Sequence, residues 1–214
     1  MRKIPPATVA RLPRYLHYLD HQTDRPTVSS EDIAAASGVN APQVRRDLSL
    51  LGSFGTRGVG YDVSRLRSLM MRALGLTGDL KVAIVGAGNL GQALAGYRGF
   101  ASRGFRVTAL YDSDPAKHGL LVHGVEVRPS HRMAADAADG QFAIAIIATP
   151  ADVAGSIAIE LAGAGVKSML NFAPARLQVP AGVNVRNVDL STELQILSFY
   201  LGRPEAEPLA AEAT

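Results

Sequence analysis

The fold of this chain is decided by the stretch Lys81-Val82-Ala83-Ile84-Val85-Gly86-Ala87-Gly88-Asn89-Leu90-Gly91. Its first half is a short apolar run of strand length, and its second half matches the pattern G-x-G-x-x-G. Gly86 permits a tight turn, Gly88 lets the backbone approach a pyrophosphate, and Gly91 lets the next helix pack closely on the strand. The start of that helix would offer N–H groups to the phosphates. The stretch therefore predicts the strand, turn and helix of a dinucleotide site.

An acidic residue follows at the distance that this pattern requires. The next strand is expected over 106–111, and Asp112 ends it, 21 residues after Gly91. An acid at this place accepts hydrogen bonds from the adenosine ribose and repels a 2′-phosphate, so Asp112 favours NAD(H) over NADP(H). Two alternatives stay open: the turn could serve another nucleotide such as coenzyme A, or it could bind nothing.

Strands and helices alternate through the rest of this half. The expected elements are helix 89–102, strand 106–111, strand 142–149, helix 152–164, strand 167–172, strand 183–188 and helix 192–201. Continuous apolar strands that alternate with helices predict an α/β fold, a doubly wound parallel sheet covered on both faces. We expect this Rossmann-like unit over 78–190, a C-terminal helix within 191–202 and a disordered tail over 203–214.

The first 77 residues follow a different pattern. Apolar residues at helical spacing predict a helix over 9–19, and Ser29 and Asn40 are placed to cap two shorter helices. A glycine-rich segment, in which Phe54, Val59, Tyr61 and Val63 are spaced as in strands, is expected to form a short hairpin before a fourth helix over 66–74. This order predicts a winged helix-turn-helix domain over 1–77.

Charge and composition exclude several classes of protein. Residues 1–77 hold 11 basic and 6 acidic side chains, a net +5, whereas residues 78–214 hold 11 and 13, a net −2. Such asymmetry suggests that the first part meets a polyanion. The chain has no cysteine, which excludes disulfides and thiol switches. It shows no secretory signal and no membrane-length apolar run, so we expect a cytoplasmic protein with no membrane partner.

The expected third helix carries a basic outer face. Arg45 and Arg46 lie on it, with Gln43 and Ser49 one turn away on either side. Arginine can bind guanine or phosphate and glutamine can bind adenine, so this face suits the major groove of DNA. Arg57, at the tip of the hairpin, could reach the minor groove or the backbone. The alternative is an ordinary solvated basic face.

With both halves placed, the chain resembles the Rex family of redox-sensing transcriptional repressors from near residue 4 to about residue 202. In the first half the resemblance is carried by Ile4-Pro5, Thr8–Leu12, Gln43–Leu48 and Gly55–Tyr61. In the second half it is carried by Gly86–Gly91, by Tyr97 with Gly99-Phe100, by Asn171–Pro174 and by Asn187–Leu190. The runs 55–61 and 171–174 are far more specific than the glycine pattern.

The resemblance implies a homodimer that binds a palindromic operator when NADH is scarce and releases it when NADH binds. It also implies that the helix 192–201 is exchanged with the partner subunit; the simpler alternative is that this helix packs on its own sheet. In one departure, His17 stands where some relatives have an arginine that contacts the aspartate matching Asp189. A neutral imidazole there would make a weaker, pH-dependent contact.

These arguments define two sets of site residues. The cofactor set is Gly86, Ala87, Gly88, Asn89, Leu90, Gly91, Tyr97, Asp112, Thr149, Pro150, Asn171 and Asp189. The DNA-binding set is Arg11, Gln43, Arg45, Arg46, Ser49, Arg57 and Gly58. By the resemblance, Tyr97 and Asp189 would lie near the nicotinamide at the subunit interface, and Thr149, Pro150 and Asn171 would line the cleft.

The competing class is a small NAD-dependent oxidoreductase with a basic N-terminal extension. Only about forty residues remain after the Rossmann-like unit, too few for a typical substrate domain. His17 and His21, spaced i, i+4, could hold a metal, but no further ligand is evident. We therefore interpret the bound NADH or NAD⁺ as a signal rather than a reagent and expect neither catalysis nor a metal.

Overall fold

A computed structural model of the chain describes residues 4–22, 24–53 and 55–201. These residues divide into two compact units between Thr77 and Gly78. Each unit has its own apolar core. Phe54 of the expected hairpin and the expected tail 203–214 lie outside the described residues.

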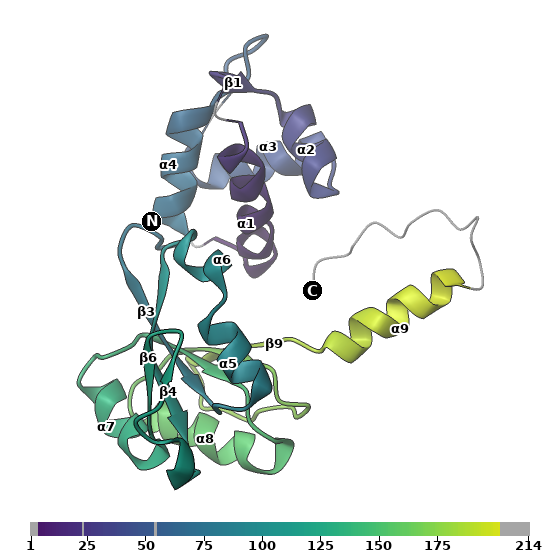
Figure 1. Cartoon of the computed structure of the whole chain (residues 1–214). Helices are drawn as coiled ribbons and strands as arrows, with labels where there is room; N and C mark the ends of the chain where they lie inside the picture. The colour runs from purple at the N-terminus through teal and green to yellow at the C-terminus, as the bar shows by residue number, and fades with distance from the viewer. Residues whose placement is uncertain (1–3, 23, 54, 202–214) are drawn as a thin grey trace. The chain divides into compact units, whose positions relative to one another are not determined.

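Helices dominate the described part of the first unit (Figure 1). Its elements are α1 (Pro6–Asp20), β1 (Thr27–Val28), α2 (Ser30–Ser37), α3 (Ala41–Leu50), β2 (Tyr61–Asp62) and α4 (Val63–Ala73). Ser29 and Asp32 form a capping box at the start of α2, and the Asn40 side chain caps α3. The helices enclose a core that includes Leu12, Ile33, Leu48, Leu66 and Met70. The expected fold class of this unit, a winged helix-turn-helix, is confirmed, although its wing is built differently.

The wing differs from the expected hairpin. β2 pairs antiparallel with β1, so Val28 faces Tyr61 across more than thirty positions of sequence. Residues 55–60, which we call the wing loop, are closed by a bridge between Thr56 and Gly60. Gly60 has φ +94°, and a Cβ there would meet the carbonyl oxygen of Val28. The hairpin prediction was wrong because β2 pairs with β1, a strand that precedes α2 in the chain, and not with a strand of the glycine-rich segment itself.

The second unit is built on a mostly parallel sheet. Its strands are β3 (Leu80–Val85), β4 (Phe105–Asp112), β5 (Leu121–Val122), β6 (Val125–Pro129), β7 (Ile144–Ile147), β8 (Ser168–Asn171) and β9 (Asn184–Asn187). Their order is β5-β6-β4-β3-β7-β8-β9, and only the β5–β6 pair is antiparallel. From β6 to β9 this is the doubly wound Rossmann order, which reverses between β3 and β7. The expected α/β fold class is confirmed.

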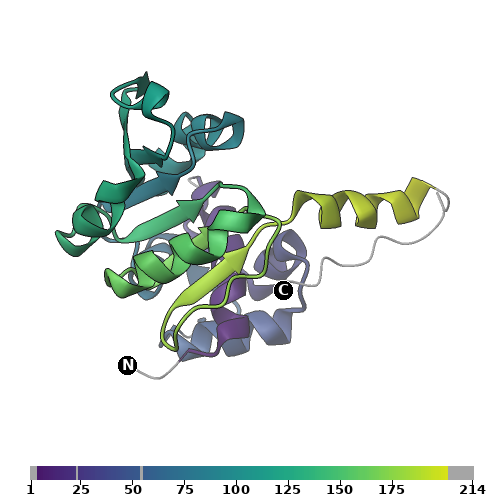
Figure 2. The ribbon, with the colours of Figure 1, turned by 90° about the horizontal axis from the view of Figure 1, so that it is seen from below.

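Helices cover both faces of this sheet. On one face α7 (Met133–Ala138) and α8 (Ala151–Gly163) pack over Ala83, Val85 and Ala145 (Figure 2). On the other face α5 (Asn89–Ala95) and α6 (Arg98–Ala101) pack over Val82 and Ile84. The alternation of residues 82 to 85 between two cores is the mark of a strand buried on both sides.

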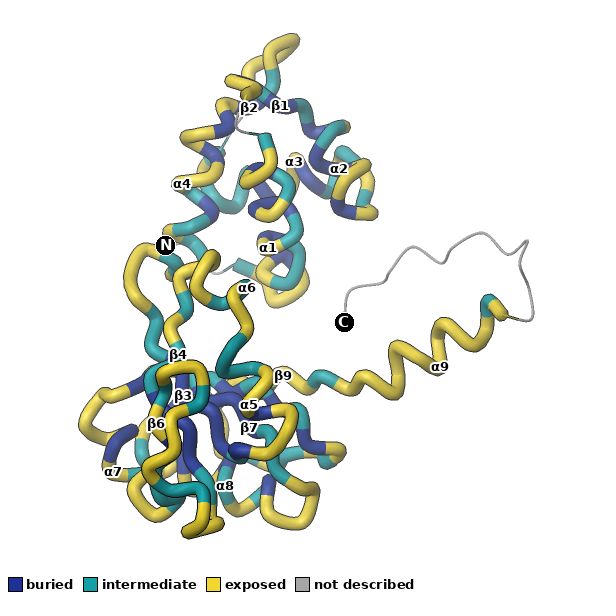
Figure 3. Tube along the Cα trace, in the orientation of Figure 1, coloured by how far each residue is buried: buried dark blue, intermediate teal, exposed yellow. Residues whose placement is uncertain are grey.

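Two details of the second unit differ from expectation. The helix expected over 89–102 is broken into α5 and α6 at Gly96-Tyr97. Strands β5 and β6 and helix α7 were not predicted. The last helix, α9 (Leu190–Leu201), has no buried residue, and Figure 3 shows it exposed along its length. Packing of this helix on its own sheet is therefore not what the structure shows.

Candidate nucleotide site and nucleic-acid interface

The glycine loop lies between β3 and α5, at the carboxyl end of the parallel strands. Gly86 has φ +102°, and a Cβ there would meet the carbonyl oxygen of Ala148. A Cβ on Gly91 would meet the carbonyl oxygen of Gly86, so α5 packs directly on the loop. Gly88, by contrast, is exposed and has nothing within 4 Å of an added Cβ. Two glycines thus serve the fold, and Gly88 leaves open space for a ligand.

The Asp112 carboxylate closes this loop. Its Oδ2 accepts from the Ala87 N–H at 2.8 Å and pairs with Lys117 Nζ at 3.0 Å, while its Oδ1 accepts from the Asp114 N–H at 2.9 Å. Burial favours the neutral acid, but the Asp114 and Ala87 N–H groups and the Lys117 ammonium outweigh it and lower the pKa of Asp112. Asp112 is therefore an anion, as a ribose acceptor must be, and a lysine shares its charge.

Residues after β7 and β8 form the neighbouring wall. Thr149 and Pro150 lie between β7 and α8, and the Thr149 hydroxyl is buried with no hydrogen-bond partner among the described residues. The Asn171 amide is fully used: its Nδ2 donates to Ala173 O, Ala175 O and Asn187 Oδ1, and its Oδ1 accepts from the Ala173 N–H. Asn171 thus shapes the loop after β8, and its contact with the cofactor stays a prediction.

Tyr97 and Asp189 are held in separate local contacts. Tyr97 is 53% exposed at the break between α5 and α6, where its ring packs edge-on against Phe100. Asp189 accepts from the Ser191 N–H at 2.9 Å and from Thr192 Oγ1 at 3.1 Å, and these bonds lower its pKa. It therefore caps the start of α9. The expected meeting of these two residues at a subunit interface stays a prediction.

The described residues fit a dinucleotide. A glycine with open space around it stands at the carboxyl edge of the sheet, an ionised acid ends the next strand, and the Thr149 hydroxyl lacks a partner. An unpaired buried hydroxyl beside a ligand site is the arrangement expected of a group that the ligand satisfies. These three observations favour a dinucleotide at this loop, and the contacts of the individual residues with it stay predictions.

In the first unit, a buried carboxylate joins α1 to α3. Asp47 is 1% exposed and accepts from Thr8 Oγ1 at 2.9 Å, Tyr15 Oη at 2.9 Å and Gln43 Nε2 at 3.0 Å. Arg11 adds a bidentate pair, Nε to Oδ2 at 2.7 Å and Nη2 to Oδ1 at 2.9 Å. Burial alone would raise the pKa of Asp47, but these donors, Arg11 first, outweigh it and lower the pKa.

Two residues that were expected to contact DNA belong to this group of side chains around Asp47, which we call the Asp47 cluster. Arg11 and Gln43 donate to the buried carboxylate, and the Arg11 side chain is only 18% exposed. In this arrangement the two side chains position α3 against α1 rather than face solvent. Their contact with DNA stays a prediction that would require the cluster to open.

Arginines do remain on the outer face of α3 and on the wing loop. Arg45 and Arg46 are exposed, and so is Arg57. Arg45 Nη1 is held by Ser30 Oγ at 2.7 Å and Glu31 Oε1 at 3.0 Å. Among the residues that the structure describes, the Arg46 and Arg57 guanidinium groups form no hydrogen bond or ion pair. Ser49 Oγ donates to the Arg46 carbonyl within the helix.

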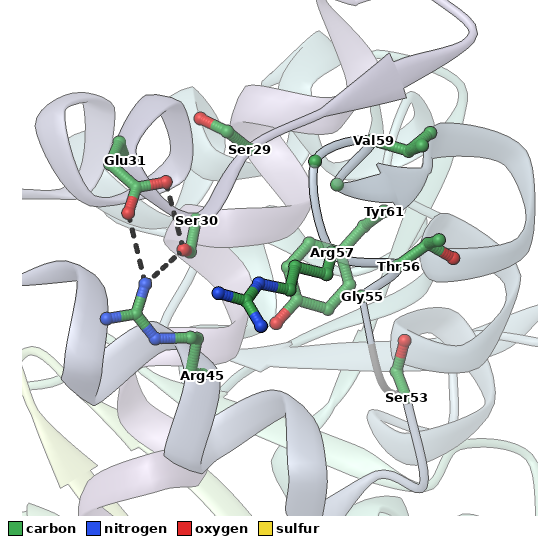
Figure 4. Close-up of a pocket in the computed structure, with 12 residues that line it drawn as sticks. Ser29, Ser30, Glu31, Arg45, Ser53, Gly55, Thr56, Arg57, Val59 and Tyr61 are labelled. Atoms are coloured by element: carbon green, nitrogen blue, oxygen red, sulfur yellow. Dashed lines mark hydrogen bonds and ion pairs between the residues drawn. The ribbon is translucent and has the colours of Figure 1, made fainter.

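A hollow of about 580 Å³ lies between α2, α3 and the wing loop (Figure 4). Arg45 lines it from α3, and Thr56, Arg57 and Gly58 line it from the wing loop. In Figure 4 the Arg57 side chain extends from the wing loop toward the side where Arg45 lies. This part of the DNA-binding set is thus brought together around one concave, cationic surface.

Sequence reasoning missed three charged residues at these sites. Lys117 pairs with Asp112, Glu31 pairs with Arg45, and Asp47 organises α3. Only Asp47 carried a visible signal, because it stands in the apolar stripe of Val44 and Leu48, where a charge must be paired. Within the described residues, no group of three or more His, Asp or Glu side chains is placed to hold a metal, and no helix has the length and apolar character to cross a membrane.

Comparison with family models gives two matches. The model described as "CoA binding domain" matches residues 77–175, and the model described as "Putative DNA-binding protein N-terminus" matches residues 3–49. The first covers the glycine loop and Asp112, and the second covers the Asp47 cluster and the α3 arginines. The first match lies almost entirely in the second unit of the structure, and the second match lies in the first unit.

Whole-chain relatives are more specific. The chain is 55% identical over 213 residues to the "Redox-sensing transcriptional repressor Rex" of Streptomyces coelicolor, across 99% of this chain and 83% of that protein. It is 47% identical to the protein of the same name from Desulfitobacterium hafniense, across 95% of this chain and 98% of that protein.

Solved structures agree with these relatives. A Rex-family repressor, RSP, was solved in complex with beta-NAD⁺ and operator DNA, and it matches with a TM-score of 0.87 and 37% identity over 96% of this chain and 95% of its own. The same repressor in complex with beta-NADH matches with a TM-score of 0.83 and 36% identity, over 96% of this chain and 97% of its own.

Proposed function

This chain belongs to the Rex family of redox-sensing transcriptional repressors, and we propose that it binds operator DNA and releases it when NADH binds. The observation that carries the proposal is the match, over 96% of the chain, to a repressor solved with operator DNA and with either form of NAD. Because operator DNA is the partner, we place the protein in the cytoplasm.

NAD(H) binding is supported by the glycine loop and its neighbours. Gly88 would let the pyrophosphate approach the backbone, Asp112 would accept from the adenosine ribose, and the Thr149 hydroxyl would gain the partner it lacks. The nicotinamide supplies a ring that is charged when oxidised and neutral when reduced. A closed, apolar surrounding favours the neutral ring, and each tenfold preference needs only about 1.4 kcal/mol.

DNA binding is supported by the cationic surface of α3 and the wing loop. Arg46 is exposed on α3 and has no competing partner among the described residues, so it is the arginine most available to a guanine edge or a phosphate. Arg57 projects from a loop whose glycines permit close approach to DNA. The net +5 of residues 1–77 adds sequence-independent attraction.

Dimerisation through α9 is supported by an apolar stripe. Leu190, Leu194, Leu197 and Leu201 are spaced four, three and four residues apart and are between 60% and 87% exposed. That spacing places them on one helix face, as in helices that pair. An exposed apolar stripe of this kind is expected to pack against another apolar surface, and exchange of α9 between two copies of the chain would bury it. Sedimentation should show a dimer, and Leu197→Glu should shift it to monomer.

We interpret the cofactor as a regulatory ligand and propose that the chain is not an enzyme. The Rex relatives are named as repressors, and the chain matches them over nearly its full length. Steady consumption of NADH with a metabolite, surviving removal of residues 1–77, would contradict this proposal.

Two substitutions separate the proposed activities. Arg46→Ala should abolish the band shift with operator DNA and leave NADH fluorescence binding intact, because Arg46 belongs to the first unit. Gly88→Val should do the reverse, because a branched side chain would fill the open space at the glycine loop. Loss of NADH binding with Arg46→Ala, or of DNA binding with Gly88→Val, would contradict the division of labour proposed here.

A further inference from the structure

Glu31, Ser30 and Arg45 line the hollow and are joined by hydrogen bonds; we call this group the clamp. Glu31 Oε1 accepts from Arg45 Nη1 at 3.0 Å, and Glu31 Oε2 accepts from Ser30 Oγ at 3.1 Å. Ser30 Oγ in turn accepts from Arg45 Nη1 at 2.7 Å, so the three side chains form a closed set (Figure 4). Arg45 is the arginine of α3 that lines the hollow, whereas Arg46 does not line it.

The ion pair between Arg45 and Glu31 is accessible to an incoming anion. The side chain of Arg45 is 50% exposed and that of Glu31 is 68% exposed, so solvent reaches both charges. Ion pairs of this exposure are weak and are readily replaced. The pair from Lys117 to Asp112 and the pair from Arg11 to Asp47 are both more buried. The Arg45–Glu31 contact is thus one that an incoming anion can break.

The hollow itself suits a DNA backbone. Glu31 is the single carboxylate among its lining residues, and the remaining polar groups are hydroxyls, main chain and the arginines 45 and 57. Arginine binds carboxylate and phosphate with the same planar set of N–H donors. Glu31 and Ser30 both contact Arg45 Nη1, so they occupy one of the guanidinium nitrogens that a DNA phosphate would use.

We propose that Glu31 is an internal competitor of DNA: in the free protein it holds Arg45, and a backbone phosphate in the hollow takes its place. This inference rests on the proposed DNA binding. The competition lowers the affinity for every sequence, because each complex must first break the contact between Glu31 and Arg45. It thereby weakens binding to non-operator DNA, where base contacts do not compensate.

The test compares Glu31→Gln with Asp20→Asn. Both changes remove one negative charge from the first unit and break one exposed ion pair, since Asp20 pairs with Arg67 at 2.6 Å. Band shifts without NADH would use a duplex with the RSP operator and a scrambled duplex of equal length, at several salt concentrations. Glu31→Gln should bind both about three- to tenfold more tightly near 0.15 M salt, with a salt slope steeper by up to about one. Asp20→Asn should change either affinity less than about twofold.

A second arm shows whether Glu31 acts through Arg45. In an Arg45→Ala background, Glu31→Gln should change affinity less than about twofold, because no guanidinium remains to be released. An undiminished gain there would mean that Glu31 repels DNA directly and would overturn the proposal. Weaker or unchanged binding of the single variant would also overturn it, and would assign Glu31 to orienting Arg45 or to no role.

These outcomes are distinct from failure of the proposed function. If the wild-type chain bound the operator duplex no better than the scrambled one, or kept its affinity with NADH, the repressor proposal would fail whatever Glu31 does. A thermal melt of each variant checks folding. The cap of α2 is made by Ser29 and Asp32, which neither substitution alters.

Discussion

Asp47 and Asp112 are both ionised carboxylates that receive several hydrogen bonds, but they serve their units differently. Asp47 is 1% exposed, and its donors come from side chains of α1 and α3. Asp112 receives two main-chain N–H groups and the half-buried ammonium of Lys117 at the edge of the nucleotide site. The first carboxylate is closed to ligands and holds a helix in place. The second closes the glycine loop and has a lysine as its side-chain partner.

The largest effect should come from opening the closed carboxylate. Asp47→Ala leaves the Arg11 guanidinium and three further donors without their acceptor, so the free energy of unfolding should fall by about 3 kcal/mol. Because α3 loses its tie to α1, operator affinity should fall more than about tenfold. Urea denaturation followed by circular dichroism measures the first effect, and a band shift measures the second.

Asp20→Asn provides the matched control for this substitution. Its partner Arg67 is an exposed arginine on α4, so the loss should stay below about 1 kcal/mol. Equal losses from the two variants would show that the Asp47 cluster is no more than a surface ion pair.

The glycine loop offers a second contrast inside the nucleotide site. Gly91→Ala places a methyl against the Gly86 carbonyl, so the second unit should lose about 2 kcal/mol or more and NADH binding should weaken. Gly88→Ala meets open space and should leave the unfolding free energy unchanged within about 0.5 kcal/mol. Thermal melts of the two variants decide the matter, and equal destabilisation would contradict the assignment of Gly91 to packing and Gly88 to the ligand.

A smaller effect is expected from Lys117, the side-chain partner of Asp112. Lys117→Ala leaves the carboxylate charge uncompensated, so a 2′-phosphate should be repelled more strongly. The preference for NADH over NADPH, measured by fluorescence titration of both, should rise about fivefold. A preference that falls would show that Lys117 supports the ribose rather than neutralising Asp112.

The smallest expected effect is the loss of stability at acid pH that follows from protonation of Asp47. The pKa of Asp47 is lower in the folded chain than in the unfolded chain, so its contribution to stability is complete above the ordinary aspartate pKa and is lost as the pH falls through the folded value. The unfolding free energy should therefore drop below about pH 4. In Asp47→Asn this acid dependence should be flatter. An unchanged slope in the variant would place the acid sensitivity elsewhere.

The parts of the fold that the sequence predicts are those that depend on contacts between residues close together in the chain. The strand 81–85, its glycine turn and Asp112 follow from neighbouring residues, and the sheet they predict is present. The need for a glycine at position 96, where the expected helix breaks, depends on a distant contact, because a Cβ there would meet the His123 ring from the β5–β6 turn. The pairing of Val28 with Tyr61 likewise depends on chain that lies far apart in sequence.

The candidate sites show the same limit. Helical spacing predicted that Arg45 and Arg46 lie on the outer face of α3, and both are exposed. Which side chains of the predicted DNA-binding set are held by partners within the protein could not be predicted from spacing. Arg11 donates to Asp47 and Arg45 to Glu31, and both pairings join residues from different helices.

The central claim is that NADH binding and operator binding oppose each other. By linkage, operator DNA must weaken NADH binding by the same factor that NADH weakens operator binding. A fluorescence titration of NADH, with and without a saturating RSP operator duplex, tests this directly. We predict an NADH affinity at least tenfold weaker in the presence of the duplex, and a much smaller change for NAD⁺. Equal NADH affinities with and without DNA would contradict the account.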